Sequence, residues 1–155
     1  ARVAQVAVGF NRWNGIKLDA FGGLVPSLEK RNILGILFPS AIFQGRAPEG
    51  GALLSVFIGG MRNPEVYAKD DETLKAIAIH EIRNTLQCTN APDLVKIFLY
   101  PFAIPQYGAD SLRRLAAIER IERDFPGLIL AGNIRDGIGM ADRVKQGRKI
   151  ADSLI

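Results

Sequence analysis

The feature that most restricts the fold of this chain is an alternation of apolar side chains in segments far apart in the sequence. The even-numbered positions are apolar throughout Val3–Phe10 and again throughout Ala52–Gly59. Asp93–Phe102 returns to a strand pattern. A period of two residues is that of a β-strand, whose side chains alternate between the two faces of a sheet. The chain is therefore predicted to contain a sheet with at least one buried face.

Two further strands are expected between the first two of these segments. The apolar runs Leu24–Leu28 and Ile33–Phe38 flank the polar Glu29–Asn32, a spacing suited to a four-residue hairpin turn and antiparallel pairing. Pro39–Gly51 contains prolines and glycines and is expected to be a loop.

Helices are predicted after these strands. Asp70 and the acidic residues behind it provide an N-cap for a run in which apolar residues recur every fourth position up to Leu86. A second helix is expected from Asp110 or Ser111 to just before Pro126, with Leu112, Leu115 and Ile118 facing inward. Leu128–Ala131 should be a short buried strand that leads through a glycine-rich turn into a last helix. The packing side of that helix is expected to carry Met140, Val144, Gly147, Ile150, Ala151 and Leu154. This layout predicts an α+β fold with a mostly antiparallel or mixed sheet and helices on one side.

The composition narrows the class of protein. Of the 155 residues 48% are apolar and 23% charged, which is typical of one globular domain. Every apolar run falls short of the roughly 18 residues needed to cross a bilayer, so no transmembrane helix is expected. Ala1 begins directly in a strand pattern, as though the chain were cut from within a longer protein.

Charge and cysteine content limit the partners and the compartment. Cys88 is the single cysteine, which rules out an internal disulfide, argues against a zinc site and fits a reducing, cytoplasmic setting. The net charge of +4 comes from basic residues that alternate with acidic ones between Arg113 and Lys149. We interpret these as a solvated surface and expect no nucleic-acid partner.

The segment Leu128–Gly139 is the most chemically suggestive. Gly132, Gly137 and Gly139 at the start of a helix would let a ligand approach bare backbone, and the positive helix end favours an anionic or electron-rich group. The dinucleotide fingerprint would need a third glycine where Asp142 stands. From spacing alone, a tight turn without a ligand is the favoured interpretation.

Other candidates offer less. His80 lies on the side of its helix away from the apolar residues, so a solvated histidine is expected, and a single histidine leaves no hydrolase triad. Arg46 is in a loop that could meet a carboxylate, although a solvated arginine is the simpler interpretation. The aromatic residues around two prolines are expected to pack in the core, with an aromatic rim against a planar ligand as the alternative; they are Phe98, Tyr100, Phe102 and Tyr107.

Five segments together carry a resemblance to a known family. In order along the chain they are Leu34–Phe38, Gly45–Gly50, Val56–Gly60, Ala103–Tyr107, and Leu130–Asn133 with Gly137–Gly139. In order and spacing they resemble the C-terminal third of protoporphyrinogen oxidases of the oxygen-dependent, flavin-containing type. The resemblance covers essentially the whole chain.

The resemblance implies a parent enzyme that uses FAD to oxidise protoporphyrinogen IX to protoporphyrin IX in haem biosynthesis, by hydride transfer to the flavin and without a catalytic side-chain base. It implies that Gly132, Gly137, Ile138 and Gly139 lie against FAD. It also places Tyr100 where the family often has a Trp beside the flavin.

The resemblance further implies a division of the chain. Residues 1–127 would belong to the substrate-binding domain, and residues 128–155 would be the last strand and helix of the FAD-binding domain. The glycine-rich segment that holds the FAD pyrophosphate in the family has no counterpart here. The chain by itself is therefore expected to be inactive and to lack its N-terminal half as a partner, and its exposed strand edges predict self-association.

Departures and alternatives remain. The family often has Pro-Asp-Cys-Ile in the last helix, whereas this chain has Ala-Asp-Arg-Val at 141–144, so Arg143 and Lys145 add charge there. Coproporphyrinogen oxidation, another flavin amine oxidase or desaturase activity, and a non-catalytic binding module are the rival functions. Peripheral attachment to the inner face of the cell membrane is left open.

Overall fold

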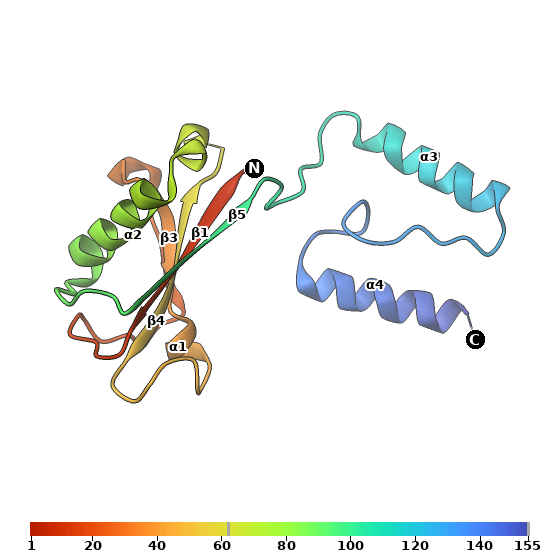
Figure 1. The fold of residues 1–155 in the computed structure, drawn as a ribbon. Helices are drawn as coiled ribbons and strands as arrows, with labels where there is room; N and C mark the ends of the chain where they lie inside the picture. Colours follow the sequence, from red (N-terminus) through yellow and green to blue (C-terminus); the bar gives the residue numbers. More distant parts are fainter. Residues whose placement is uncertain (62, 155) are drawn as a thin grey trace. The chain divides into compact units, whose positions relative to one another are not determined.

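A computed structural model describes residues 1–61 and 63–154. Residues 1–103 and residues 104–155 form two compact units, each of which is described by itself (Figure 1). The first unit contains β1 (Val3–Phe10), β2 (Gly22–Leu24), β3 (Ile33–Leu37), α1 (Pro39–Ile42), β4 (Ala52–Gly59), α2 (Asp71–Leu86) and β5 (Leu94–Tyr100), with 3-10 turns at Ser27–Glu29 and Pro64–Ala68. The second contains α3 (Ser111–Asp124) and α4 (Met140–Ser153).

The five strands form one antiparallel sheet in the order β2-β3-β4-β1-β5. The long central strands β1 and β4 pair from Val3 opposite Gly59 to Phe10 opposite Ala52. A register shift between Ile33 and Gly35 interrupts the pairing of β3 with β4. The predicted α+β class with an antiparallel sheet is confirmed, as are the strands Val3–Phe10 and Ala52–Gly59.

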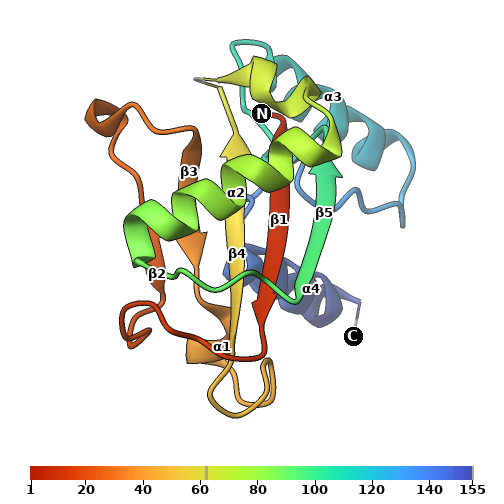
Figure 2. The same ribbon diagram turned by 60° about the vertical axis from the view of Figure 1, so that its left-hand side comes forward.

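The hydrophobic core lies between one face of this sheet and α2, which crosses the strands (Figure 2). Leu74, Ala78 and Ile82 recur every fourth residue and are at most 1% exposed, so the predicted amphipathic helix is confirmed. The helix begins where predicted, because the Asp70 carboxylate accepts a hydrogen bond of 2.8 Å from the amide of Thr73. The same hydrogen bond, with the Thr73 hydroxyl, lowers the pKa of Asp70.

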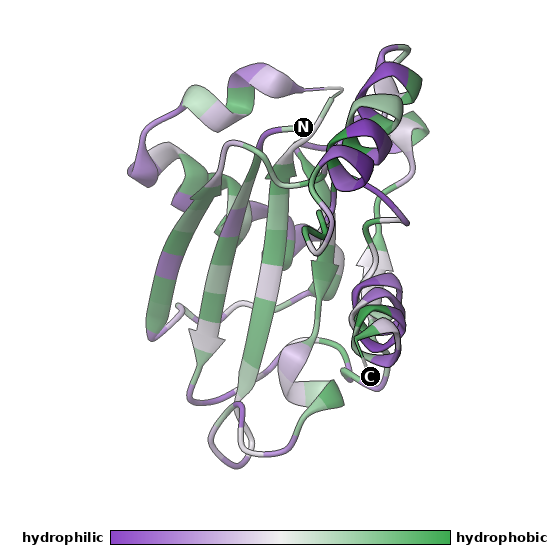
Figure 3. Cartoon of the chain, turned by 90° about the vertical axis from the view of Figure 1, so that its right-hand side faces the viewer, coloured by the Kyte–Doolittle hydropathy of each residue, from purple (hydrophilic) through white to green (hydrophobic). Residues whose placement is uncertain are grey.

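The two sheet faces differ in character. The even-numbered residues of β1 and β4 face α2 and are buried, whereas the odd-numbered face carries a mixture of polar and apolar side chains. On that face Gln5 donates to the Ser55 hydroxyl at 3.1 Å. Phe98 and Tyr100 share the parity of the odd-numbered face on the edge strand β5 and are 39% and 44% exposed. Figure 3 shows that the strands are mostly apolar along their length.

Several local predictions need correction in the first unit. The hairpin pairs antiparallel as expected, but its first strand is Gly22–Leu24, and a 3-10 turn at Ser27–Glu29 lengthens the connection. Leu24 and Leu28 are 86% and 91% exposed, so the apolar run that suggested a strand there is not buried. The expected loop 39–51 contains one helical turn, α1, which Pro39 begins.

In the second unit, the predicted strand Leu128–Ala131 is wrong: these residues form no ladder. A strand requires a neighbouring strand, and the described part of this unit provides none. Side chains satisfy the backbone instead, because the amide of Leu130 donates to Glu122 and the amide of Gly132 donates to Gln146. Both predicted helices are present.

The predicted packing faces of these helices are only partly correct. Ile118 of α3 is buried, but Leu112 is 79% exposed. Met140, Val144 and Leu154 of α4 are between 70% and 88% exposed, which contradicts the predicted packing side of that helix. The buried residue of α4 is Gln146, since the polar network described below lies on its face of the helix.

Along the chain, the boundary between the two units falls between Ala103 and Ile104, whereas the predicted domain boundary lies between residues 127 and 128. That boundary concerns the domains of a longer enzyme and stays a prediction. Among the helices of the described residues, none combines the length and the apolar character needed to cross a membrane.

Candidate functional site

The glycine turn, residues 132–139, is held in a backbone conformation that few residues other than glycine adopt. Gly132, Asp136 and Gly137 have φ of 105°, 62° and 95°. A side chain at Gly137 would also collide with Asp142, whose Cγ would lie 2.7 Å from the added Cβ. Apart from its two chain neighbours, no described residue has an atom within 4 Å of the Cβ position of Gly132. Gly132 therefore offers bare backbone beside open space, whereas Gly137 is needed for close packing.

Helix α4 begins directly after this turn. The amide of Gly139 donates to the Asp142 carboxylate at 3.0 Å, and the first helical bond runs from the Arg143 amide to the Gly139 carbonyl. The amides of the residues between them have no acceptor inside the helix, so the positive end of the helix dipole lies at this turn. Gly139 itself has an ordinary φ of −71°.

Two side chains of α4 reach back to the glycine turn. Arg143 Nη2 donates to the carbonyls of Arg135 at 2.9 Å and Gly137 at 2.8 Å. Arg143 Nη1 donates to Gln146 Oε1 at 2.7 Å, and the same oxygen accepts the amide of Gly132 at 2.8 Å. Gln146 Nε2 donates to Asp136 at 2.7 Å. The helix thus fixes both ends of the turn.

An ion pair anchors the glycine turn to α3. Arg135 Nη1 lies 2.9 Å and 2.8 Å from the two carboxylate oxygens of Glu122. The hydrogen bond from Arg135 lowers the pKa of Glu122, and the same bond raises the pKa of Arg135. The hydrogen bond from Gln146 lowers the pKa of Asp136. These carboxylates are therefore ionised in the folded unit at neutral pH.

Cavities border the turn within the second unit. One of about 400 Å³ is lined by residues 134–137 of the turn, by Tyr107, and by both polar and apolar residues of α3. A neighbouring cavity of about 540 Å³ extends along Pro105 and Ala117. The Tyr107 hydroxyl donates to the carbonyl of Asn133 at 3.0 Å, which ties the 103–107 segment to the turn. Volumes of this size are typical of small-molecule sites.

The predicted site residues fall into two groups. Gly132, Gly137, Ile138 and Gly139 all lie in the glycine turn, whereas Tyr100 is the last residue of β5 in the other unit. Core packing of the aromatic cluster was the wrong expectation, because Phe102 is 91% exposed and Tyr107 is 52% exposed. Flavin contact by Tyr100 and by the four residues of the glycine turn stays a prediction.

Sequence reasoning missed the network of Glu122, Arg135, Asp136, Arg143 and Gln146. The alternating charges of this region were interpreted as a solvated surface, but these five side chains bond to one another or to the turn. The available signal was Arg143 with Gln146 three residues later, a spacing that places two side chains on one helix face.

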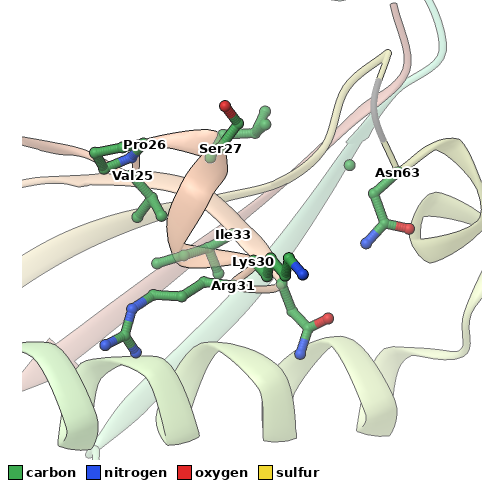
Figure 4. Close-up of a pocket in the computed structure, with 10 residues that line it drawn as sticks. Val25, Pro26, Ser27, Lys30, Arg31, Ile33 and Asn63 are labelled. Atoms are coloured by element: carbon green, nitrogen blue, oxygen red, sulfur yellow. The ribbon is translucent and has the colours of Figure 1, made fainter.

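A cavity of about 250 Å³ in the first unit is a rival site (Figure 4). Lys30, Arg31 and Asn63 give it a polar lining between the β2–β3 connection and the segment that follows β4. Arg31 Nη1 lies 3.2 Å from a carboxylate oxygen of Glu81, which is 3% exposed, and the amide of Asn32 donates to the same carboxylate. Arg31 therefore anchors the β2–β3 connection to α2 and is already paired with Glu81.

The remaining candidates have local roles. His80 is exposed, as predicted, and its Nε2 lies 2.8 Å from Asn84 Nδ2. Arg46 is exposed and lies over the ring of Phe43, 5.6 Å from its centroid. Cys88 is buried and donates to Asn14.

Comparison with known proteins decides the family. The family model described as flavin containing amine oxidoreductase matches residues 1–155. The chain belongs to this family.

Curated relatives agree with that assignment. The mitochondrial protoporphyrinogen oxidase of Nicotiana tabacum is 36% identical over 141 residues, which cover 89% of this chain and 28% of that protein. The coproporphyrinogen III oxidase of Propionibacterium freudenreichii is 32% identical over 79% of this chain and 23% of that protein. The chain thus spans less than a third of the length of these relatives.

A solved structure from Exiguobacterium sp. 255-15, provisionally named a protoporphyrinogen oxidase, has the same fold. It superposes with a TM-score of 0.79 at 22% identity, over 99% of this chain and 34% of that one.

The flavin that defines this family fits the residues of the glycine turn. Open space beside Gly132 would admit a ligand to the backbone, and a cavity of about 400 Å³ is lined by Gly137. The free amides at the start of α4 favour an electron-rich ring edge.

Proposed function

We propose that this chain is the C-terminal part of an FAD-dependent protoporphyrinogen oxidase, an enzyme that converts protoporphyrinogen IX to protoporphyrin IX. The observation that carries the proposal is the combination of the family match over the whole chain with five segments spaced as in protoporphyrinogen oxidases. The identity of 36% to the tobacco enzyme supports the same substrate class.

The glycine turn would hold the flavin ring from one side. Gly132 would let the ring approach the backbone, and the amides at the start of α4 would donate to its electron-rich edge. The bound FAD would accept the hydride of the substrate. Since Asp142 already accepts the amide of Gly139 and the Gly139 carbonyl accepts the amide of Arg143, the contact of Gly139 would be through its Cα.

The sheet would contribute a wall of aromatic side chains toward the substrate. Phe57, Phe98 and Tyr100 have the parity of the sheet face opposite α2, and aromatic side chains stack favourably on planar rings. Such a wall orients the substrate and excludes water. We also propose that Tyr100 lies beside the flavin, because it stands where the resembling family often has a Trp.

The test is oxidation of protoporphyrinogen IX by the complete flavoprotein that contains this chain, followed through the fluorescence of the porphyrin product. Replacing Gly132 by Val should abolish flavin absorbance and activity together, because a branched side chain would fill the open space. Replacing exposed Gly127, which also has a positive φ, by Val provides the matched control. Normal flavin content in the Gly132→Val protein would contradict the proposed contact.

The 155-residue chain by itself should carry no flavin after purification, because only one side of the site is present. Absorbance in the flavin bands measures this directly. Stoichiometric bound flavin in the chain alone would show that the turn and its cavities hold the cofactor without further residues.

Coproporphyrinogen is the second candidate substrate, because the Propionibacterium relative is a coproporphyrinogen III oxidase. The two substrates differ in the number of carboxylates, four against two, so an enzyme for coproporphyrinogen needs more basic contacts. The ratio of kcat/KM for the two porphyrinogens decides between them.

We further propose a cytoplasmic compartment and self-association of the isolated chain. A reducing, cytoplasmic setting fits the single buried cysteine, Cys88, although the names of the plant relatives place those proteins in mitochondria or chloroplasts. The edge strand β5 has exposed apolar residues, which favours self-association of the isolated chain. Light scattering would detect it, and a monodisperse monomer would contradict it.

A further inference from the structure

We infer that Arg143 and Gln146 are positioning residues that set the direction of the turn amides facing the flavin. This inference rests on the proposed flavin contact of the glycine turn. Arg143 is the third residue of Ala-Asp-Arg-Val at 141–144, where the resembling family often has a neutral residue.

The position of Arg143 is electrostatically unfavourable unless it has specific partners. It lies in the first turn of α4, where the helix dipole repels a cation. Its two Nη2 bonds, to the carbonyls of Arg135 and Gly137, supply those partners at 2.9 Å and 2.8 Å. Its Nε atom is buried and has no hydrogen-bond partner among the described residues, which leaves one donor available next to the turn.

The two carbonyl bonds determine where the following amides point. In a planar trans peptide the C=O of one residue and the N–H of the next point in opposite directions. Because the carbonyls of Arg135 and Gly137 face the guanidinium, the N–H groups of Asp136 and Ile138 face away from it. Arg143 thus directs these two amides away from its guanidinium, and we place the flavin on the side that they face.

Gln146 completes the arrangement through the other atoms of the turn. Its Oε1 accepts the amide of Gly132, and its Nε2 donates to Asp136, a residue other than glycine with a positive φ of 62°. Left-handed backbone at such a residue is strained and persists where the surroundings hold it. Gln146 is 8% exposed, so these bonds are shielded from water.

The first experiment uses the 155-residue chain without flavin and compares Arg143→Met with Arg148→Met. Arg148 is in the same helix, its side chain is 85% exposed, and its one ion pair, with Asp152, is 3.9 Å long. Hydrogen exchange of amides 130–139 should become about tenfold faster in Arg143→Met and in Gln146→Leu, as expected for the loss of a partly buried hydrogen bond. Arg148→Met should exchange like the wild type. Wild-type exchange in both test variants would overturn the inference.

The second experiment uses the complete flavoprotein that contains this chain, with and without FAD. FAD should slow the exchange of the turn amides in the wild type and in Arg148→Met, and Arg143→Met should lose this protection and shift the visible flavin spectrum. Arg143→Lys should restore part of both effects, because its ammonium can still reach one carbonyl. A flavin spectrum and protection unchanged in Arg143→Met and Gln146→Leu would refute the positioning role.

The two experiments separate this inference from the proposed function. If FAD protects no turn amide in the wild type, the proposed flavin contact is wrong, whatever the variants do. If FAD protects the wild-type turn and the variants equally, the flavin contact stands and the positioning role of Arg143 and Gln146 is wrong.

Discussion

Replacing Gly137 by Ala tests whether the glycine turn is as tightly constrained as the structure indicates. Two costs are expected. An L-residue at a φ of 95° is strained by about 1–2 kcal/mol. The new Cβ would also lie 2.7 Å from Asp142 Cγ, so the carboxylate must move away and lose its hydrogen bond of 3.0 Å to the Gly139 amide. That bond contributes about 1 kcal/mol.

The two costs together predict a loss of about 2–3 kcal/mol in the local free energy of opening of the second unit. At about 1.4 kcal/mol per factor of ten, the open population should rise roughly 30- to 150-fold. Gly132→Ala is the matched control, because its φ of 105° is similar but no atom lies within 4 Å of the added Cβ. Its cost should be limited to the backbone strain.

Hydrogen exchange of the α4 amides measures the local opening, and the fluorescence of Trp13 reports the first unit, which should not change. A double-mutant cycle with Asp142→Ala separates the two costs, since removing the carboxylate removes the collision. The cost of Gly137→Ala should then fall to about 1–2 kcal/mol, the strain alone. Equal effects at Gly132 and Gly137, or an undiminished cost in the Asp142→Ala background, would refute the reasoning.

Three further predictions concern stability. Hydrogen bonds from Arg135 and Gln146 lower the pKa values of Glu122 and Asp136, so both carboxylates stabilise the second unit fully above their unfolded pKa values of 4.5 and 3.8. This contribution should be lost as the pH falls through the lower pKa values of the folded state. Far-UV circular dichroism during acid titration of the wild type and of Glu122→Gln checks it. Arg31→Met should destabilise the first unit by about 2–3 kcal/mol, because it leaves the buried Glu81 carboxylate with the Asn32 amide alone. Urea unfolding followed by Trp13 fluorescence measures this loss. Glu29→Gln should have almost no effect, because the Glu29 carboxylate lies 3.9 Å from Arg31 Nε. Leu54→Ala removes a fully buried side chain and should cost about 2–5 kcal/mol in the same assay, whereas Leu24→Ala, at an 86% exposed position, should leave the midpoint within error.

Patterns that depend on neighbours in sequence were predicted well. The strands Val3–Phe10 and Ala52–Gly59 and the helix after Asp70 agree with the structure, because alternation and fourfold recurrence are consequences of local backbone geometry. The same holds for the glycine turn, where Gly132 and Gly137 adopt the positive φ that glycine allows. For these elements the sequence needed no tertiary information.

Patterns that depend on a distant partner were predicted poorly. Leu128–Ala131 has the composition of a strand, but a strand exists only when another strand pairs with it, and the amide of Leu130 bonds to Glu122 instead. The exposed Met140 and Val144 likewise show that an apolar helix face is buried only where a partner surface lies against it. Neither partner can be identified from the residues themselves.

The sequence alone determined the family, the antiparallel sheet and the position of the glycine turn, since each follows from residue types at fixed spacing. Only the tertiary structure decided that Arg143 and Gln146, residues typical of a solvated helix surface, bond to that turn. The physical reason is that a long polar side chain can form its hydrogen bonds either with water or with backbone groups. The choice between them depends on how the chain reverses direction between Gly132 and Gly139, which brings the carbonyls of Arg135 and Gly137 within reach of the helix.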